Sequence, residues 1–322
     1  MTKPKILLTR PWPEAAEQWI SERFDVTINR EKPLTRDELK AAMRDYDGIC
    51  PTVVDKFDAE VLAMPGARVK VIANFGVGFE HIDLNAAKAA GIVVTNTPDV
   101  LTEATADIAL LLMLMTSRRG GEGERQLRAD EWKGWGTTHM LGQSLEGKTL
   151  GLYGFGRIAR ATAHRAHVAL GMNIAYASRS RASDEVEFLF HARYVPTLAE
   201  LAKQSDVLSL HCPGGAETYH IVNADLLKVM KPTAILINTA RGSVVDEGAL
   251  AAALRARTIW AAGLDVYERE PVVHPDLLGL ENAVLLPHLG SATIETRTNM
   301  GLRAAENAAA FFAGEQPRDR IA

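Results

Sequence analysis

Cysteine is scarce in this sequence, and a long apolar run and a large excess of one charge are both absent. Only two cysteines, Cys50 and Cys212, occur in 322 residues, which excludes the disulfide framework of a small secreted domain. The first residues also lack the apolar core of a signal peptide. We therefore expect a protein of the reducing cytoplasm.

The most apolar run, Ile108 to Met115, is far too short to cross a bilayer and is typical of a buried helix. A formal net charge of -4 gives the chain no general attraction for nucleic acid or for an anionic membrane surface. We therefore expect neither nucleic acid nor a membrane as a partner, and we assign no metal ligands.

Short apolar runs alternate with helical stretches along the chain, whose length suggests two domains. This alternation predicts parallel βαβ units and an α/β fold. The strands expected in the first half are Lys5–Thr9, Val26–Ile28, Gly48–Cys50, Val69–Ala73 and Ile92–Thr95. Those expected in the second half are Thr149–Tyr153, Asn173–Ala177, Val207–His211, Ala234–Asn238, Ala261–Val266 and Val284–Leu286.

A polar region broken by glycines, Gly120 to Gly147, follows a long expected helix over Asp99–Arg119. It carries Trp132 and Trp135, which would expose much apolar surface in a solvated loop. Two interpretations have equal weight on these grounds: burial against a partner, or packing on the parent subunit.

The stretch from Thr149 to Ala159 has the layout of a nucleotide-binding βα turn. The first glycine, Gly154, allows a tight bend, and the second, Gly156, lets a pyrophosphate approach the backbone at a helix N-terminus. Ala159 stands where the third glycine is usual. Alone, this pattern is as compatible with an ordinary tight turn.

The next strand end indicates which nicotinamide cofactor binds. NAD enzymes place an acid about twenty residues after the glycines, to bind the ribose 2′-hydroxyl. Here the chain has Ser178 and Ser180 alternating with Arg179 and Arg181, which would attract a 2′-phosphate. This favours NADP(H) and leaves NAD(H) possible; the alternative is two solvated arginines.

Polar residues after neighbouring strands are candidates for catalysis, because ligands bind at the carboxyl ends of strands in open α/β sheets. Arg241, Asp265, Glu270 and His288 occupy such positions. A histidine can protonate the oxygen that becomes negative during hydride transfer, and a guanidinium can bind a carboxylate as a fork. Singly, each has a plain alternative, such as a surface ion pair for Arg241 or a turn brace for Asp265.

Several segments together resemble the D-isomer-specific 2-hydroxyacid dehydrogenases, and within them the glyoxylate/hydroxypyruvate reductases. The likeness covers nearly the whole chain, and the order and spacing of the segments make it specific. The segments are Asn74–Gly78 with His81–Asp83, Asn96–Thr102, Gly154–Ile158, Asn238–Gly242, Gly263–Glu268 with Glu270-Pro271, and Leu286–Thr293.

The resemblance implies a role for each candidate. Arg241 would bind substrate, His288 would donate the proton and Glu270 would be its carboxylate partner. The N–H groups of Val77 and Gly78 would hold the substrate carboxylate. The implied cofactor contacts are Gly154, Phe155, Gly156, Arg157, Ile158, Ser178, Arg179, Arg181, Cys212, Pro213, Thr218, Thr239, Asp265 (at the nicotinamide carboxamide), His288 and Gly290.

The resemblance also implies a domain organisation. Residues 1–100 with 290–322 would form a smaller flavodoxin-like substrate domain, and residues 101–289 a Rossmann nucleotide-binding domain, with hinges near 100 and 290. Both would be doubly wound parallel sheets. An excursion over residues 118–147 would make a homodimer and bring Trp135 into the partner's active site. One departure, Cys212-Pro213-Gly214-Gly215, affects a loop near the cofactor.

The function expected is NADPH-preferring reduction of a small 2-keto acid, glyoxylate or hydroxypyruvate, to glycolate or D-glycerate. Two alternatives stay open. One is a dehydrogenase of the same family for another acid, such as 2-ketogluconate or phosphite. The other is a nucleotide-sensing corepressor that binds the cofactor without turnover; no disordered tail or peptide-docking extension supports it.

Overall fold

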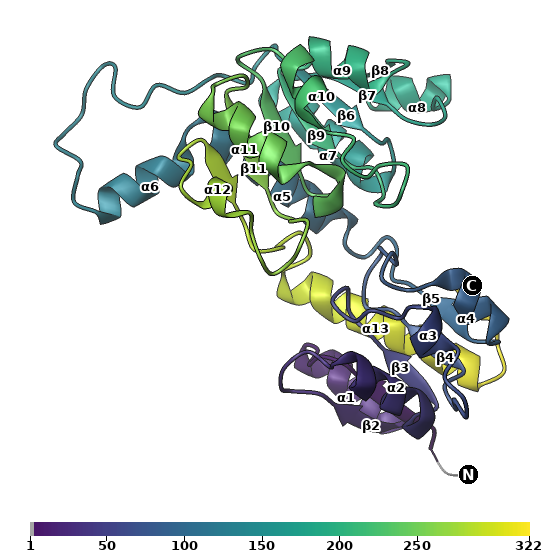
Figure 1. The fold of residues 1–322 in the computed structure, drawn as a ribbon. Helices are drawn as coiled ribbons and strands as arrows, with labels where there is room; N and C mark the ends of the chain where they lie inside the picture. Colours follow the sequence, from purple (N-terminus) through teal and green to yellow (C-terminus); the bar gives the residue numbers. More distant parts are fainter. Residues whose placement is uncertain (1–2) are drawn as a thin grey trace. The chain divides into compact units, whose positions relative to one another are not determined.

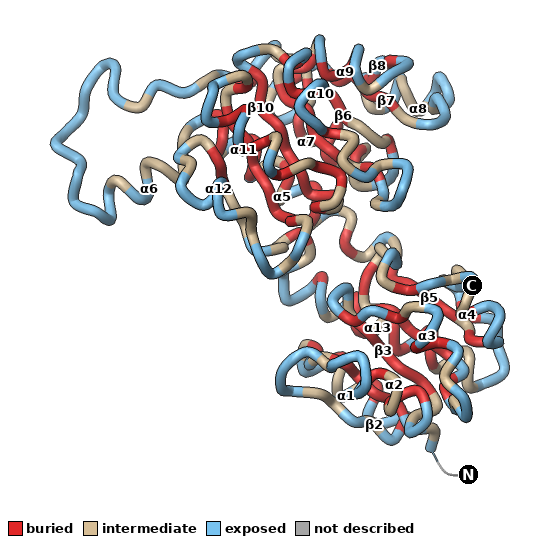
Figure 2. Tube along the Cα trace, viewed as in Figure 1, coloured by how far each residue is buried: buried red, intermediate tan, exposed pale blue. Residues whose placement is uncertain are grey.

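The computed structural model describes residues 3–322, which form two compact units (Figure 1). The first contains Met1–Leu101 and Ala292–Ala322, and the second contains Thr102–Ser291. Each has its own parallel sheet and its own buried core, shown in red in Figure 2. The expected fold class, two parallel-sheet α/β domains, is confirmed.

The sheet of the first unit has five parallel strands in the order β2-β1-β3-β4-β5, which is the order of flavodoxin-like folds. All five lie where the sequence pattern predicts them. Their bounds are β1 Lys5–Leu8, β2 Asp25–Ile28, β3 Gly48–Cys50, β4 Val71–Ala73 and β5 Val93–Thr95.

The helices of the first unit are α1 Glu14–Arg23, α2 Arg36–Asp45, α3 Ala59–Leu62, α4 Leu84–Ala89 and α13 Ile294–Phe312, and polar side chains cap the N-termini of all but α1. The side chains of Thr35, Asp58 and Asp83 each accept from backbone N–H groups in the first turn. The C-terminal helix α13 packs on α1 so closely that a Cβ at Gly301 would lie 2.6 Å from the Cβ of Ala16. This contact explains why residues 292–322 belong to the first unit.

The sheet of the second unit has seven parallel strands in the order β12-β11-β10-β9-β6-β7-β8, a Rossmann order with one added edge strand. Their bounds are β6 Thr149–Tyr153, β7 Asn173–Ala177, β8 Ala192–Tyr194, β9 Val207–Leu210, β10 Ile235–Asn238, β11 Ala261–Leu264 and β12 Ala283–Leu285. The sequence analysis missed β8. It is a three-residue edge strand whose middle residue, Arg193, is exposed, so it lacks an apolar run.

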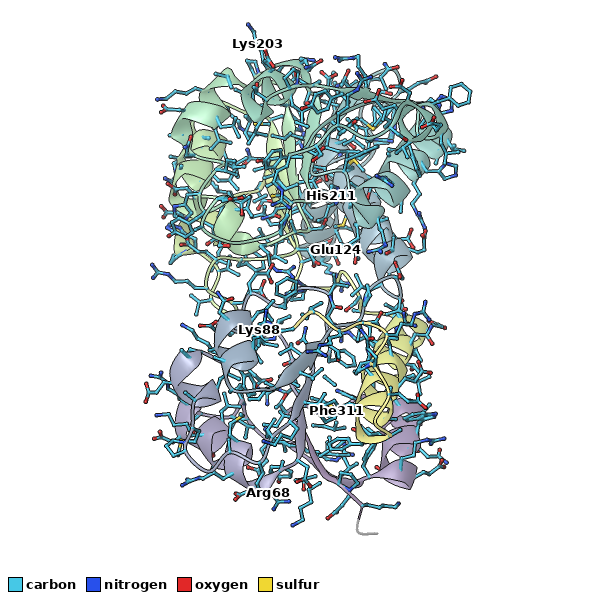
Figure 3. All side chains as sticks on the ribbon, turned by 90° about the vertical axis from the view of Figure 1, so that its right-hand side faces the viewer. Arg68, Lys88, Glu124, Lys203, His211 and Phe311 are labelled. Atoms are coloured by element: carbon cyan, nitrogen blue, oxygen red, sulfur yellow. The ribbon has the colours of Figure 1, made fainter. Side chains whose placement is uncertain are left out.

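The helices of the second unit are α5 Thr102–Ser117, α6 Gly120–Arg128, α7 Arg157–Leu170, α8 Asp184–Leu189, α9 Leu198–Gln204, α10 Ala224–Val229, α11 Glu247–Arg255, α12 Pro275–Leu278 and the 3-10 turn η1 Gly242–Val244. The apolar run of α5, expected to be buried, is buried on one face only: Leu112 and Met113 lie in a core cluster, whereas Leu111 and Leu114 are exposed. Charged side chains such as Lys203 stand on the outside (Figure 3). Within residues 3–322, no helix combines the length and apolarity of a membrane span.

The region after α5 projects from the body of the second unit (Figure 1). It begins with the helix α6, which the sequence analysis did not expect and which buries none of its residues. Exposed chain follows (Figure 2), including Trp132 at 50% and Trp135 at 83% exposure. The structure therefore does not show these tryptophans packed on the parent subunit.

Candidate active site

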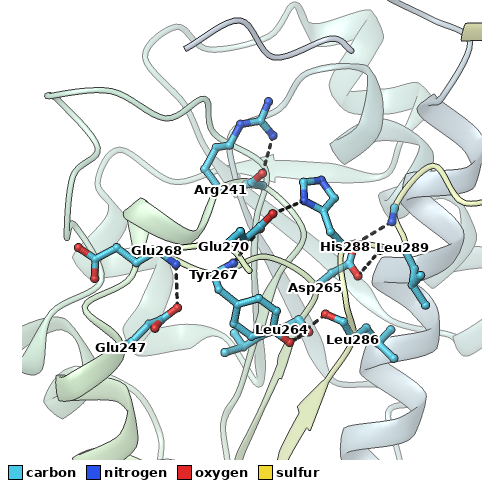
Figure 4. A network of polar contacts seen from close by, with 12 residues as sticks. Arg241, Glu247, Leu264, Asp265, Tyr267, Glu268, Glu270, Leu286, His288 and Leu289 are labelled. Atoms are coloured by element: carbon cyan, nitrogen blue, oxygen red, sulfur yellow. Dashed lines mark hydrogen bonds and ion pairs between the residues drawn. The ribbon is translucent and has the colours of Figure 1, made fainter. Parts of the chain in front are cut away.

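Three neighbouring strands carry the expected catalytic residues at their carboxyl ends. Arg241 follows β10, Glu270 follows β11 and His288 follows β12, and these strands are adjacent and parallel in the sheet. Parallel strands end at the same edge, so residues up to 47 positions apart in the chain lie together (Figure 4).

The centre of the site is a histidine–carboxylate pair. Nδ1 of His288 lies 2.7 Å from Oε2 of Glu270, whose Oε1 accepts the backbone N–H of Tyr267 at 3.0 Å. Burial raises the pKa of Glu270, but the hydrogen bond and charge of His288, the Tyr267 N–H and the charge of Arg241 outweigh it, and the pKa lies below its usual range. Glu270 is therefore ionised at neutral pH and can stabilise a protonated His288.

Arg241 stands on a turn that a buried asparagine holds. Oδ1 of Asn238 accepts the N–H of Ala240 at 3.0 Å, while its Nδ2 donates to the carbonyl of Arg241 at 2.9 Å. The guanidinium Nη1 donates to the carbonyl of Ala240 at 2.7 Å. Asn238 belongs to the Asn238–Gly242 motif, but its role was not predicted from the sequence. Its amide can both accept and donate a hydrogen bond, which is the property that this turn uses.

Asp265 stabilises the segment that carries the histidine. It is 1% exposed. Its Oδ1 accepts the N–H of Leu289 at 2.6 Å, its Oδ2 accepts the N–H of Gly290 at 2.8 Å, and its backbone carbonyl accepts the N–H of His288. Burial raises the pKa of the Asp265 carboxyl despite these donors. These contacts make Asp265 a turn brace; its contact with nicotinamide stays a prediction.

The turns after β10 and β11 touch through their backbones. A Cβ at Gly242 would lie 1.8 Å from the carbonyl carbon of Tyr267, so no other residue fits there. The buried Tyr267 in turn donates its hydroxyl to the carbonyl of Leu286 at 2.8 Å and thereby joins the loop after β11 to the end of β12. The three strand ends are thus held at fixed spacing.

A second histidine and carboxylate, on the loops after β9 and β11, approach each other and were missed from sequence. Nε2 of His220 is 3.1 Å from Oε1 of Glu268, which also accepts the hydroxyl of Tyr219 at 3.0 Å. Glu268 had been quoted only as part of a motif, and nothing in the sequence linked it to a residue 48 positions earlier. Within residues 3–322, no group of three or more His, Cys, Asp or Glu side chains could hold a metal ion.

The two glycines of the turn after β6 differ in whether the protein itself leaves room for a side chain. Gly154 has a φ of 92°, and a Cβ there would lie 2.7 Å from the carbonyl oxygen of His211. Gly156 has an ordinary φ, and no atom lies within 4 Å of the position that a Cβ would take, so the protein itself does not require glycine there. The exposed Arg157 and half-buried Ile158 then begin α7, whose first N–H groups lack helical acceptors.

Two residues of this turn belong to the core. The ring of Phe155 is buried and stacks on Tyr176 with centroids 4.0 Å apart. The methyl group of Ala159 is buried in the core cluster beneath α7. Phe155 can therefore meet a cofactor only through its backbone, and Ala159 does the packing expected of the third glycine.

Further expected cofactor residues follow β9 and β10. Cys212 is buried, and burial raises the pKa of its thiol to about 11. The hydroxyl of Thr218 closes the following loop by donating to the carbonyl of Pro213 at 2.8 Å. Oγ1 of the buried Thr239 has no hydrogen-bond partner among residues 3–322, and an orphaned hydroxyl at a strand end suits a ligand.

The two arginines after β7 are not equivalent. The guanidinium of Arg181 is bound by Glu187 at 2.7 Å and by Asp184 at 3.3 Å. The side chain of Arg179 is exposed, and Oγ of Ser178 donates to a backbone carbonyl two residues on. Of the two arginines expected at a 2′-phosphate, Arg181 is already paired within the protein.

The first unit holds the remaining expected residues. Val77 and Gly78 lie in a turn directly after β4, and neither backbone N–H has a hydrogen-bond acceptor among residues 3–322. Two adjacent N–H groups in a turn form a common anion site.

Comparison with known proteins extends these observations. Residues 110–290 match the family model described as "D-isomer specific 2-hydroxyacid dehydrogenase, NAD binding domain". The glyoxylate reductase of Thermococcus onnurineus is 46% identical over 321 residues, which are 98% of this chain and 95% of that relative. That of Pyrococcus furiosus is 43% identical over 320 residues, covering 98% and 94%.

Solved structures are similar over the full chain. A protein from Thermus thermophilus is 42% identical with a TM-score of 0.92, covering 99% of this chain and 100% of that one. An NADPH-dependent glyoxylate/hydroxypyruvate reductase from Sinorhizobium meliloti, in complex with NADP and malonate, is 38% identical with a TM-score of 0.88 and covers 100% and 97%.

The backbone contact at Gly242 leads to a stability prediction. In Gly242→Ala the added methyl group meets the Tyr267 carbonyl, so the second unit loses about 3 kcal/mol and its Tm falls by roughly 6–12 °C. In Gly279→Ala no atom lies within 4 Å of the added group, and the Tm stays within about 2 °C. Scanning calorimetry measures both; an unchanged Tm for Gly242→Ala contradicts the contact.

Proposed function

The chain belongs to the D-isomer-specific 2-hydroxyacid dehydrogenase family and is an NAD(P)-dependent enzyme, and on this premise we propose that it reduces glyoxylate or hydroxypyruvate with a preference for NADPH. The observation that carries the proposal is the His288–Glu270 pair, 2.7 Å apart, on the strand end beside that of Arg241. The reductases named among its relatives support the substrate.

His288 supplies the proton in this proposal. A bound reduced nicotinamide would supply the hydride for the keto carbon, so negative charge would develop on the carbonyl oxygen. Nε2 of His288 faces away from Glu270, because Nδ1 is taken by that carboxylate, and it donates its proton to the oxygen. Glu270 stabilises the charged imidazole before transfer and fixes which ring nitrogen reacts.

Arg241 and the first unit bind the substrate. The guanidinium of Arg241 pairs with the keto acid and withdraws charge from its carbonyl. The N–H groups of Val77 and Gly78 hold the substrate carboxylate.

Residues at the carboxyl edge of the second sheet would hold the cofactor. Gly156 would leave room for its pyrophosphate, because no protein atom fills the space that a Cβ would take there. The Thr239 hydroxyl, which lacks a protein partner among residues 3–322, and the Cys212 to Thr218 loop line the rest. For the 2′-phosphate of NADPH we assign Arg179 and Ser178, since Arg181 is paired with Glu187.

The projecting region joins two copies of the chain. A side chain as exposed as Trp135 is costly in water, and tryptophan is enriched among residues that dominate interface energies. We assign the excursion over residues 118–147 to a homodimer contact, in which Trp135 of the partner subunit contributes to the substrate site.

The catalytic assignment predicts severe losses. His288→Ala and Arg241→Ala each lower kcat/KM for NADPH-dependent glyoxylate reduction by about a hundred- to ten-thousandfold, with the cofactor Kd unchanged. His164→Ala, an exposed histidine on α7, keeps normal turnover. Near-normal rates in either site variant would refute the assignment. Absence of turnover in the native enzyme over a panel of keto acids would favour the corepressor.

The unequal arginines predict an unequal effect on cofactor choice. Arg179→Ser raises the KM for NADPH roughly tenfold, the loss of one charge-assisted contact, and leaves the KM for NADH nearly unchanged. Arg181→Ser keeps the NADPH/NADH ratio within about twofold because its charge already serves Glu187. Steady-state kinetics with both cofactors decides. Equal effects of the two variants would contradict the assignment.

The dimer assignment predicts the behaviour of Trp135→Ala. Removing this side chain weakens dimerisation by roughly thirtyfold, a typical loss for an interface tryptophan, and raises the KM for glyoxylate. Trp19→Ala, the same change on α1 of the first unit, leaves the association constant unaltered. Sedimentation velocity over a concentration series measures both; a native protein that stays monomeric excludes the assignment.

A further inference from the structure

The turn over Gly76 to Gly78 has all three of its carbonyl groups bound from inside the first unit. The carbonyl of Gly76 accepts the N–H of Thr97 at 3.0 Å and Nδ2 of Asn74 at 3.0 Å. The carbonyl of Gly78 accepts the same Nδ2 at 2.8 Å. The carbonyl of Val77 accepts Nδ2 of Asn96 at 2.9 Å.

These bonds orient the opposite sides of the peptide groups. A trans peptide is planar, so its N–H points opposite to its C=O. The bonds to Gly76 therefore set the direction of the Val77 N–H. The single bond from Asn96 to the Val77 carbonyl likewise sets the direction of the Gly78 N–H.

Asn96 is itself held by the C-terminal part of the chain. Its backbone N–H donates to the carbonyl of Asp319 at 3.2 Å, and its carbonyl accepts Nδ2 of Asn307 on α13 at 3.3 Å. The two supporting residues also bind each other, since Nδ2 of Asn307 donates to Oδ2 of Asp319 at 2.9 Å and Oδ1 of Asn307 accepts the Asp319 N–H at 3.2 Å.

The support is buried and charged. The Asp319 side chain is 6% exposed and is paired with Arg303 on α13, at 2.5 Å from Nε. An antiparallel bridge between Arg320 and Thr95 fixes the tail along the edge of β5, directly before Asn96. A buried hydrogen-bond network that links a turn to two other segments limits the geometry that the turn can adopt.

We propose that Asn96 is a positioning residue for catalysis: through the Val77 carbonyl it aims the Gly78 N–H at the substrate carboxylate, and the Asn307–Asp319 pair holds it in place. The inference rests on the proposed function of Val77 and Gly78. It gives the C-terminal tail a role in substrate affinity, because the tail fixes the asparagine that fixes the turn.

The test is Asn96→Ala, which removes the amide and adds no charge. The turn can then rotate the Val77 carbonyl toward water and misdirect the Gly78 N–H. We expect the KM for glyoxylate and the Ki of oxamate, a carboxylate analogue, to rise together by roughly ten- to a hundredfold. We expect kcat within about threefold and the NADPH Kd within about twofold of native values.

Asn282→Ala is the matched control. The amide of Asn282 also donates to backbone carbonyls, those of Leu254 and Trp260, but it lies at the amino end of β12 in the second unit. This variant loses stability but keeps the glyoxylate KM. An unchanged KM and Ki in Asn96→Ala would overturn the proposal. So would an equal loss of NADPH affinity, which would indicate general loosening.

Asn307→Ala provides a second reading if Asn96→Ala does not fold. It leaves the Asn96 amide in place but removes its support, so KM and Ki rise in the same proportion by a smaller factor; no rise contradicts the inference. The native enzyme separates this result from the proposed function. If it reduces neither glyoxylate nor hydroxypyruvate, the proposed function is wrong; if it reduces either one and both variants match it, only the positioning role is wrong.

Discussion

Among the glycines of residues 3–322, the tightest approach is the backbone contact between the turn after β10 and the loop after β11. The missing side chain of Gly242 lets the two chains approach so far that a Cβ would lie 1.8 Å from the Tyr267 carbonyl carbon. This contact sets the distance between the turn that carries Arg241 and the loop that carries Glu270. Tyr267 extends it to β12 through the Leu286 carbonyl. The relative positions of Arg241 and Glu270 depend on this contact. Their positions matter because hydride transfer tolerates little misplacement of the reacting groups.

Charge is arranged around this frame by burial and pairing. Glu270 is half-buried but stays ionised, since His288, Arg241 and the Tyr267 N–H lower its pKa more than burial raises it. Asp265 is more deeply buried and serves the backbone of the histidine segment instead. Two carboxylates after one strand thus do different work, one on the imidazole and one on the turn, because their surroundings differ.

Sequence reasoning predicted the fold, and the strand ends at which the candidate site residues lie, where a local pattern reported on structure. Apolar runs predicted eleven strands, and residues after them predicted the Arg241, Glu270 and His288 positions. It failed where no local pattern existed. The edge strand β8 has no apolar run, α6 buries nothing, and the partner of Arg181, Glu187, lies on the following helix. Such pairings depend on how the chain packs.

The sequence by itself determined the two parallel sheets, the family resemblance and the residue types that reduction of a keto acid needs, because alternation of apolar runs and residues at strand ends are local properties. Only the tertiary structure decided which groups are already in use. It paired Arg181, turned Asp265 toward the backbone, left Trp135 in solvent and tied Asn96 to the C-terminal tail. Hydrogen bonding and burial between distant segments are properties of the packed chain, and no local pattern records them.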